Sequence, residues 1–169
     1  CIRDRRYLDP DARTPNPEFA LNQLEHSGAS ILLAGDNFGC GSSREHAVWA
    51  LMESGFRAVI APSFATIFRN NAMRNGLLTV ALEQHELDEL VAWVSADPVT
   101  HTIKLDLETC TIESNPDRDK KVFSVDPTAR DMLLEGLDEI GLTEQSIDLV
   151  ARFEEQDQAL RPWVYLSSD

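Results

Sequence analysis

Residues 29–47 read ASILLAGDNFGCGSSREHA, and this stretch decides the fold that we expect. Its first six residues form a mostly apolar run that is typical of a short buried strand. Three glycines follow within seven residues: Gly35, Gly39 and Gly41. An amphipathic segment over 43–54 then predicts a helix that ends before Gly55. The pattern is therefore a strand, a tight loop whose backbone can lie close to a ligand, and the start of a helix.

The loop carries groups that suit an oxygen-rich anion. Ser42 and Ser43 supply hydroxyls, and Arg44 supplies a guanidinium that can form two hydrogen bonds to a carboxylate. We expect the first helical turn to add free N–H groups. The same N–H groups and a nearby cation would stabilise a serine alkoxide. A serine at a helix start is more often only an N-cap, and the pattern alone leaves both interpretations open.

Two other catalytic arrangements are disfavoured in this loop. Glu45 and His46 follow the serines, but adjacent positions on a helix face different directions, so a serine–histidine pair is not expected. The G-x-S-x-G nucleophile elbow is absent, because Ser42 is followed by Ser43 and no glycine closes the motif. Cys40 lies between two glycines and is either a reactive thiol or a small residue that fills a tight turn.

Composition bounds the class of protein. The 169 residues suffice for one domain with a sizeable core, and a net charge of −14 argues against nucleic acid as a partner. An anionic substrate must then be held by local positive charge, here Arg44. Cys1, Cys40 and Cys110 are too widely spaced for a disulfide framework, a metal site or an iron–sulfur site. Without a membrane-spanning run or a signal peptide, we expect a cytoplasmic protein with no metal of its own.

The next part of the chain predicts an α/β fold. Short apolar strands at 57–61 and 77–82 alternate with helices at 64–74 and 84–95, which is typical of parallel strands joined by crossovers. Ser63 is the expected N-cap of the first of these helices. In the helix over 43–54, we expect four residues to face the core: Ala47, Trp49, Ala50 and Leu51.

The second half of the sequence has a different pattern. Residues 100–113 alternate apolar and polar side chains, which predicts one strand with a solvated face. A charged turn leads to a second strand at 122–125, so we expect a hairpin. Helices are expected at 127–138 and 143–156, separated by Gly141.

With these residues in view, 35–47 resembles, almost letter for letter, the signature of the small subunits of 3-isopropylmalate dehydratase. These are the swivelling-domain members of the aconitase superfamily, and the core GSSREH at 41–46 is shared with aconitase itself. The resemblance extends to further segments: 15–19 with 21–23, 56–65, 70–71 with 75–78, and 136–143. It implies an α/β fold, a three-layer β/β/α swivelling domain like the fourth domain of aconitase.

The resemblance also implies an activity. The family interconverts 2-isopropylmalate and 3-isopropylmalate by dehydration and rehydration through isopropylmaleate, in leucine biosynthesis. In this superfamily a 4Fe–4S cluster acts as a Lewis acid on the departing hydroxyl, and the large subunit carries it on its own cysteines. The chain is thus expected to bind no cofactor itself, and to act on a small hydroxy-dicarboxylate only together with that large subunit.

Roles within the loop follow residue by residue from the resemblance. Ser42 matches the serine that abstracts the substrate proton as an alkoxide. Ser43 and Arg44 match groups that bind a substrate carboxylate, assisted by backbone N–H groups around Cys40 and Gly41. Two positions are expected to support the loop without taking part in the chemistry: Glu45 and His46.

Three functions stay open at this point. Besides the dehydratase subunit, the chain could be the small subunit of a related hydro-lyase, a homoaconitase or a citramalate/methylmalate isomerase, or a non-catalytic binding module of the same fold. The intact Ser42, Ser43 and Arg44 argue against the last. We expect one domain over 1–169 with a peripheral tail at 157–169. It would lack the family's amino-terminal Asp-Thr-Asp strand and the specificity loop after it.

Overall fold

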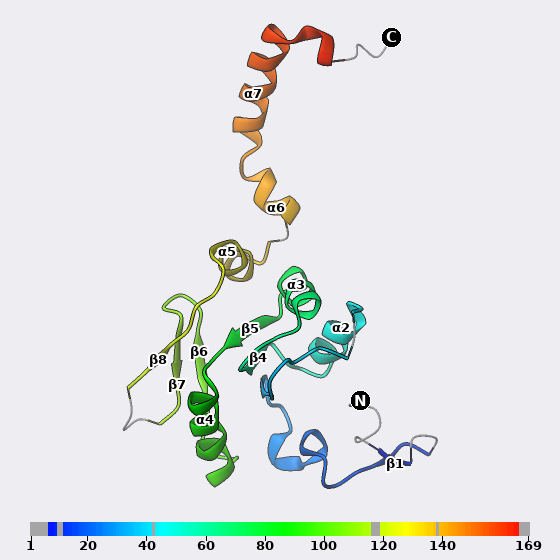
Figure 1. Cartoon of the computed structure of the whole chain (residues 1–169), viewed down its shortest axis with the longest axis vertical. Coiled ribbons are helices and arrows are strands. Elements are labelled where there is room, and N and C mark those ends of the chain that lie inside the picture. Colours follow the sequence, from blue (N-terminus) through cyan, green and yellow to red (C-terminus); the bar gives the residue numbers. More distant parts are fainter. Residues whose placement is uncertain (1–6, 10–11, 42, 116–118, 138, 166–169) are drawn as a thin grey trace.

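The computed structural model describes residues 7–9, 12–41, 43–115, 119–137 and 139–165 (Figure 1). The predictions for Ser42 and Cys1 lie outside these residues. The described chain opens with an antiparallel ribbon of β1 (Tyr7–Asp9) and β2 (Thr14–Pro15). Two 3-10 turns follow, η1 (Ala20–Asn22) and η2 (Leu24–His26).

A parallel sheet forms the centre of the fold. Its strands lie in the order β3 (Ile31–Leu33), β4 (Ala58–Ala61) and β5 (Leu78–Ala81). Leu32 lies beside Val59, and Val59 lies beside Thr79. All four residues of β4 are buried, because this strand has a neighbour on each edge and side chains packed on both faces. The predicted alternation of apolar strands with crossover helices is confirmed.

Helices and a second sheet cover the two faces of the parallel sheet. The helices are α2 (His46–Glu53), α3 (Thr66–Arg74) and α4 (Gln84–Ala96). On one face, Val59 belongs to an apolar cluster with Leu51 of α2 and Phe68 of α3. On the other face, Ile60 belongs to a cluster with Leu90 of α4 and Ile112 of the second sheet. The order of α2 and α3, parallel sheet and second sheet agrees with the expected three-layer architecture.

Helix α2 begins three residues later than predicted, and two of its expected inward residues are wrong. Val48 is fully buried and Leu51 is buried, and because they are three positions apart they define the inward side of the helix. Half-buried Ala47 also packs on this side. Trp49, which is 41% exposed, and Ala50 face away from the core.

The second sheet corrects another prediction. It is antiparallel, in the order β6 (Lys104–Asp106), β7 (Thr111–Glu113) and β8 (Lys121–Val122). The stretch predicted as one strand over 100–113 is therefore two strands joined by a turn. The N–H of Thr109 donates to the Asp106 carboxylate at 2.9 Å, and Cys110 takes a φ of 51°. This turn carries no glycine or proline, so the alternating pattern concealed it.

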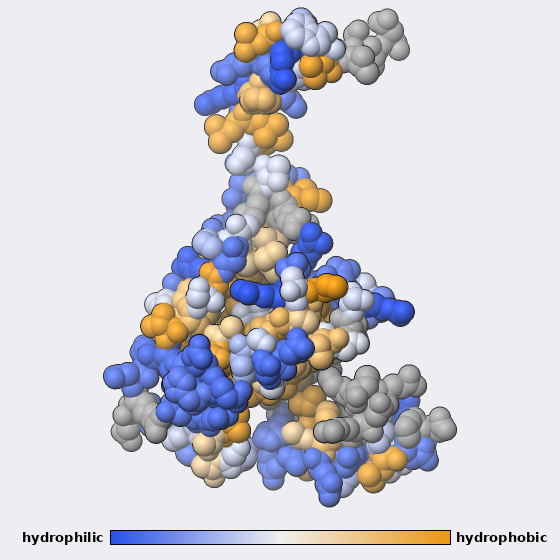
Figure 2. All heavy atoms as spheres, in the orientation of Figure 1, coloured by the Kyte–Doolittle hydropathy of each residue, from blue (hydrophilic) through white to orange (hydrophobic). Residues whose placement is uncertain are grey.

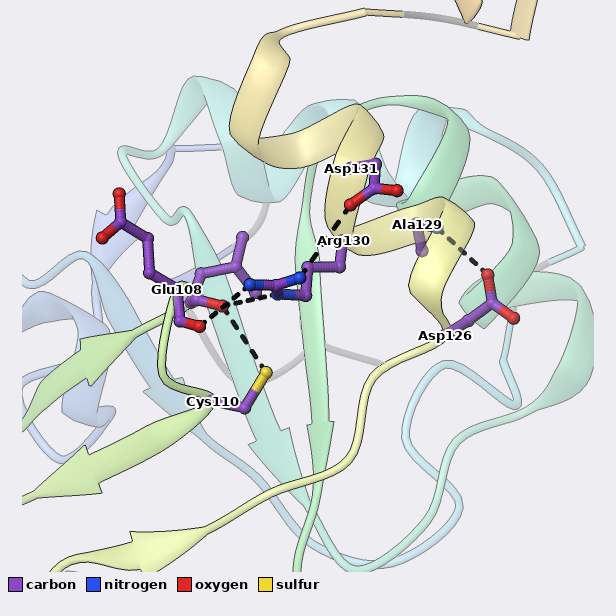
Figure 3. A network of polar contacts seen from close by, with 7 residues as sticks. Glu108, Cys110, Asp126, Ala129, Arg130 and Asp131 are labelled. Carbon is purple, nitrogen blue, oxygen red and sulfur yellow. Dashed lines mark hydrogen bonds and ion pairs between the residues drawn. The ribbon is translucent and has the colours of Figure 1, made fainter.

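Helix α5 (Pro127–Glu135) is held against that turn, as Figure 3 shows. Asp126 caps the helix by accepting the N–H of Ala129 at 3.0 Å. The guanidinium of Arg130 donates to the carbonyls of Leu107 at 3.0 Å and Glu108 at 2.9 Å. The helix ends at Gly136, which takes a left-handed φ of 67°, so the predicted end at 138 is two to three residues late.

The last part of the described chain consists of α6 (Glu139–Glu144), α7 (Ile147–Leu160) and the 3-10 turn η3 (Pro162–Val164). Gly141 lies inside α6 and does not separate two helices as predicted. Figure 1 shows α6 and α7 extending away from both sheets beyond α5. No described helix has the length and apolar composition required to cross a membrane.

Candidate active-site loop

The loop between β3 and α2 lies at the carboxyl edge of the parallel sheet, where ligands of α/β proteins usually bind. Five predicted site residues in the loop and at the start of α2 are exposed: Cys40, Gly41, Ser43, Arg44 and His46. Exposed Glu45 precedes α2 directly. The described groups expected to meet substrate therefore face solvent from a single short segment.

The loop is tied to the segment that follows β4. The N–H of Phe38 donates to the carbonyl of Ser63 at 3.0 Å, and the Phe38 carbonyl accepts the N–H of Ala65 at 2.9 Å. This pairing forms a short parallel bridge between Phe38 and Phe64. These backbone hydrogen bonds fix the position of the middle of the loop relative to the edge of the sheet.

Ser63 is an anchor of the loop, and the prediction that it caps a helix is wrong. Its Oγ accepts the N–H of Asn37 at 2.9 Å, and its hydroxyl donates to the carboxylate of Asp36. Helix α3 begins only at Thr66, after Ala65 in an extended conformation, and Ala65 makes no side-chain cap. Asp36 and Ser63 are site residues that sequence reasoning missed. The sequence signal was that each residue comes just after one of two neighbouring parallel strands. The carboxyl ends of such strands lie at the same edge of the sheet, so the two side chains can meet there.

An aromatic floor lies under the loop. The ring of Phe38 packs edge-on against Phe68 at 5.2 Å and against Phe64 at 6.3 Å between centroids. Gly39 sits directly above Phe68 with a φ of 85°, and a Cβ at this position would overlap the Phe68 ring. Both the backbone conformation and the available space therefore require glycine here.

The start of α2 changes one expectation for the loop. The N-cap of α2 is Glu45, whose side chain makes no capping hydrogen bond. The amides of Ala47, Val48 and Trp49 donate to the carbonyls of Arg44 and Glu45, at 2.8 to 3.2 Å. Three N–H groups of the first turn, which were expected to be free, are thus already bonded. This leaves the loop backbone and Arg44 as the main groups available to hold an anion.

His46 packs on its own helix. Its ring lies 4.8 Å from that of Trp49, whose Nε1 donates to Asn75 Oδ1 at 2.7 Å. Asn75 in turn donates from Nδ2 to the carbonyl of Asn71 at 2.8 Å. The start of α2 is linked in this way to the end of α3. Such a contact is compatible with a supporting role for His46, which stays a prediction.

A cavity of about 510 Å³ opens beside the loop at the carboxyl ends of the three parallel strands. Its lining includes the carboxylates of Asp36, Glu83 and Glu86. These groups would repel an anionic ligand, so the Arg44 side of the loop is the more favourable place for one.

The described residues do not fit a metal or cluster site. Within them, no three His, Cys, Asp or Glu side chains gather where they could hold a metal ion. Cys40 lies in the loop and Cys110 at the turn between β6 and β7, and both are free thiols. A cluster needs several thiolates at one place, which this part of the chain does not offer.

Comparison with known proteins first defines the class. Residues 3–85 match the family model of the aconitase C-terminal domain. The 3-isopropylmalate dehydratase small subunit of Cupriavidus necator is 48% identical to this chain over 160 residues, which cover 95% of the chain and 76% of that protein. The crystal structure of 3-isopropylmalate dehydratase from Methanocaldococcus jannaschii matches at a TM-score of 0.55 and 25% identity, covering 89% of this chain and 90% of that chain.

The chain belongs to the family of 3-isopropylmalate dehydratase small subunits within the aconitase superfamily. It is thus a subunit of a hydro-lyase, and membership in a family of small subunits implies a large-subunit partner.

Proposed function

We propose that this chain, with its large subunit, interconverts 2-isopropylmalate and 3-isopropylmalate through isopropylmaleate in leucine biosynthesis. The observation that carries the proposal is the intact GSSREH segment at 41–46 in a chain 48% identical to a small subunit of that name. The exposed loop at the carboxyl edge of the sheet supports it, because the loop can meet both a substrate and a partner subunit.

In this proposal Ser42 is the base. Its alkoxide takes the proton from the substrate carbon next to a carboxylate, the carbon–carbon double bond forms, and the neighbouring hydroxyl leaves. Isopropylmaleate results, with the elements of water divided between the departed hydroxide and the proton held on Ser42. Rehydration with the opposite orientation adds hydroxide to the other carbon, returns the proton from Ser42 and gives the isomer. Arg44 stabilises the alkoxide and forms two hydrogen bonds to a carboxylate, and Ser43 adds a third donor.

The rest of the loop positions these groups. The backbone N–H of Gly41 adds a donor to the carboxylate, whereas the N–H of Cys40 already donates to the Asn37 carbonyl at 3.3 Å. Glu45 and His46 support the start of α2. Asp36 and Ser63 fix the position of the segment before Cys40, because Ser63 donates to Asp36 and accepts the N–H of Asn37.

The iron–sulfur cluster is assigned to the large subunit in this proposal, since the described residues of this chain do not fit one. The widely spaced cysteines support a cytoplasmic location. We also propose that the chain forms one domain, because both apolar clusters pack on the same central strand β4.

The test mixes this chain anaerobically with a cluster-loaded large subunit and follows the absorbance of isopropylmaleate formed from 3-isopropylmalate. Absorbance is expected only when both chains are present. Activity on homoaconitate or citramalate without activity on isopropylmalate would support the proposed mechanism but change the proposed substrate. No turnover of any of the three substrates, with the cluster intact and the complex formed, would indicate that the chain is a non-catalytic module.

A further inference from the structure

The end of the described chain exposes an unusual amount of apolar surface. We call residues 139–165, which comprise α6, α7 and η3, the arm. Eight large apolar side chains of the arm are exposed: Ile140, Ile147, Leu149, Val150, Phe153, Leu160, Trp163 and Val164. Figure 2 shows apolar side chains, with hydrophilic ones between them, over this projecting part of the molecule. Large exposed apolar side chains bordered by polar ones are typical of an interaction site.

Helix α7 does not have the packing that a helix of its length needs. Every residue of its 14 is exposed except Asp157, and among the described elements it packs mainly against the short η3. An isolated helix shorter than ~12–15 residues is only marginally stable in water, and most helical stability in proteins comes from packing an apolar face. The arm therefore gains stability when another surface covers it.

Three large apolar residues of α7 share one side of the helix. Leu149, Phe153 and Leu160 follow each other at four and seven positions, which a period of 3.6 residues places on one stripe. Asp148 and Glu155 lie on the opposite side. This is an amphipathic helix whose apolar stripe faces solvent.

The end of the arm is held in a defined conformation by hydrogen bonds to one buried carboxylate. Asp157 is 8% exposed and accepts hydrogen bonds from Arg161 Nε at 2.7 Å and from the Tyr165 hydroxyl at 3.0 Å. The backbone N–H of Arg161 also donates to the Asp157 carbonyl at 2.7 Å. These bonds reverse the chain at the end of α7 and present Trp163, 75% exposed, beside the helix.

The charge of the arm selects the kind of occupant. Residues 139–161 contain six acidic and two basic side chains, and the whole chain carries a net charge of −14. A second copy would place one acidic rim against another, and like charges across an interface are destabilising. The complementary surface is an apolar groove bordered by Lys and Arg on a different protein.

We propose that the apolar stripe of the arm, with Phe153 and Trp163 as its anchors, is a docking surface for the large subunit. The identity of this partner rests on the proposed function. Two buried aromatic side chains, at ~150–250 Å² each, would supply roughly half of the ~800 Å² that each partner of a standard interface buries. The arm lies beyond α5, away from the loop at the sheet edge, so docking through it leaves the Ser42 loop free to face the substrate (Figure 1).

The experiment measures the affinity of the full chain for the cluster-loaded large subunit by sedimentation velocity, with turnover at saturating large subunit as a second readout. Phe153→Asp places a charge on the apolar stripe and is expected to weaken association about tenfold or more. Trp163→Ala is expected to weaken it in the same direction. Turnover at saturation stays at the wild-type value for both, because the loop is untouched.

Ala159→Asp is the matched control, because it introduces the same residue into α7 on the polar side and costs helix stability as well. It is expected to leave the affinity unchanged within about twofold. Far-ultraviolet circular dichroism of each variant checks that the body of the chain is folded.

Three outcomes would overturn the inference: unchanged affinity of Phe153→Asp, equal loss in Phe153→Asp and Ala159→Asp, or a dimer of this chain alone that Phe153→Asp dissociates. The third would make a second copy the occupant. Ser42→Ala keeps this test separate from the proposed function, since it should associate normally and show no turnover. If wild-type complexes form through the arm but never turn over isopropylmalate, the docking inference stands and the assigned activity fails.

Discussion

The loop after β3 and the arm at the end of the chain are both exposed, but they are supported in opposite ways. The loop is hydrogen-bonded to the segment after β4, and its Phe38 and Gly39 rest on Phe68. The arm is a helix with an uncovered apolar stripe and a small folded end. The exposed groups of the loop are polar side chains on a backbone that the rest of the fold holds in place. The exposed groups of the arm are apolar side chains that another molecule can cover. The two regions should therefore respond differently to substitution.

The largest difference is expected for Ser42→Ala. Removing the proposed base should lower turnover of the assembled enzyme on the order of 10²- to 10⁴-fold, since proton transfer by a positioned group contributes that much. Association with the large subunit and the free energy of unfolding should stay at wild-type values. Turnover is read from isopropylmaleate absorbance and association from sedimentation. Near-normal turnover would remove Ser42 from the mechanism.

Arg44→Lys is expected to lower kcat/KM roughly ten- to a hundredfold, because a hydrogen bond to a charged group is worth ~1.5–3 kcal/mol and a point charge cannot replace the planar guanidinium. KM should rise and kcat should fall together, as measured by steady-state kinetics at saturating large subunit. Wild-type kinetics in this variant would contradict the carboxylate-binding role.

Gly39→Ala tests the aromatic floor. A Cβ at this left-handed position overlaps Phe68, so the free energy of unfolding should fall by about 1–3 kcal/mol and turnover should fall with it. Gly35→Ala is the matched control, because no heavy atom lies within 4 Å of its Cβ position. It should change stability by less than about 0.5 kcal/mol. Urea denaturation measures both, and equal losses would show that the floor does not set the loop.

The smallest effect is expected in the arm, from Asp157→Asn. The variant weakens the bond to half-exposed Arg161. Partly exposed ion pairs contribute only ~0–1 kcal/mol, so affinity for the large subunit should fall by less than about tenfold. Turnover at saturation should not change. A loss of turnover without a loss of affinity would mean that the end of the arm acts on the loop.

Much of the fold was predictable because apolar runs report burial directly. Residues 57–61 and 77–82 contain the strands β4 and β5. The failures occurred where a long-range contact or an inconspicuous turn overrides the local pattern. Serine is a residue type that often caps helices, but Ser63 instead forms hydrogen bonds with Asp36 and Asn37. The turn at 107–110 has no breaker residue, and Arg130 of a later helix helps to hold it.

The sequence by itself determined the family, the α/β alternation and the chemistry of the loop, because these reside in residue types and in spacings between near neighbours. Only the tertiary structure decided that Glu45 precedes α2, that Asp36 and Ser63 anchor the loop, and that Gly39 must lie on Phe68. It also decided that the apolar stripe of α7 faces solvent. The physical reason is that a hydrophobic pattern states which side of a helix must be covered, while the partner that covers it is chosen by residues far away in the chain or in another molecule.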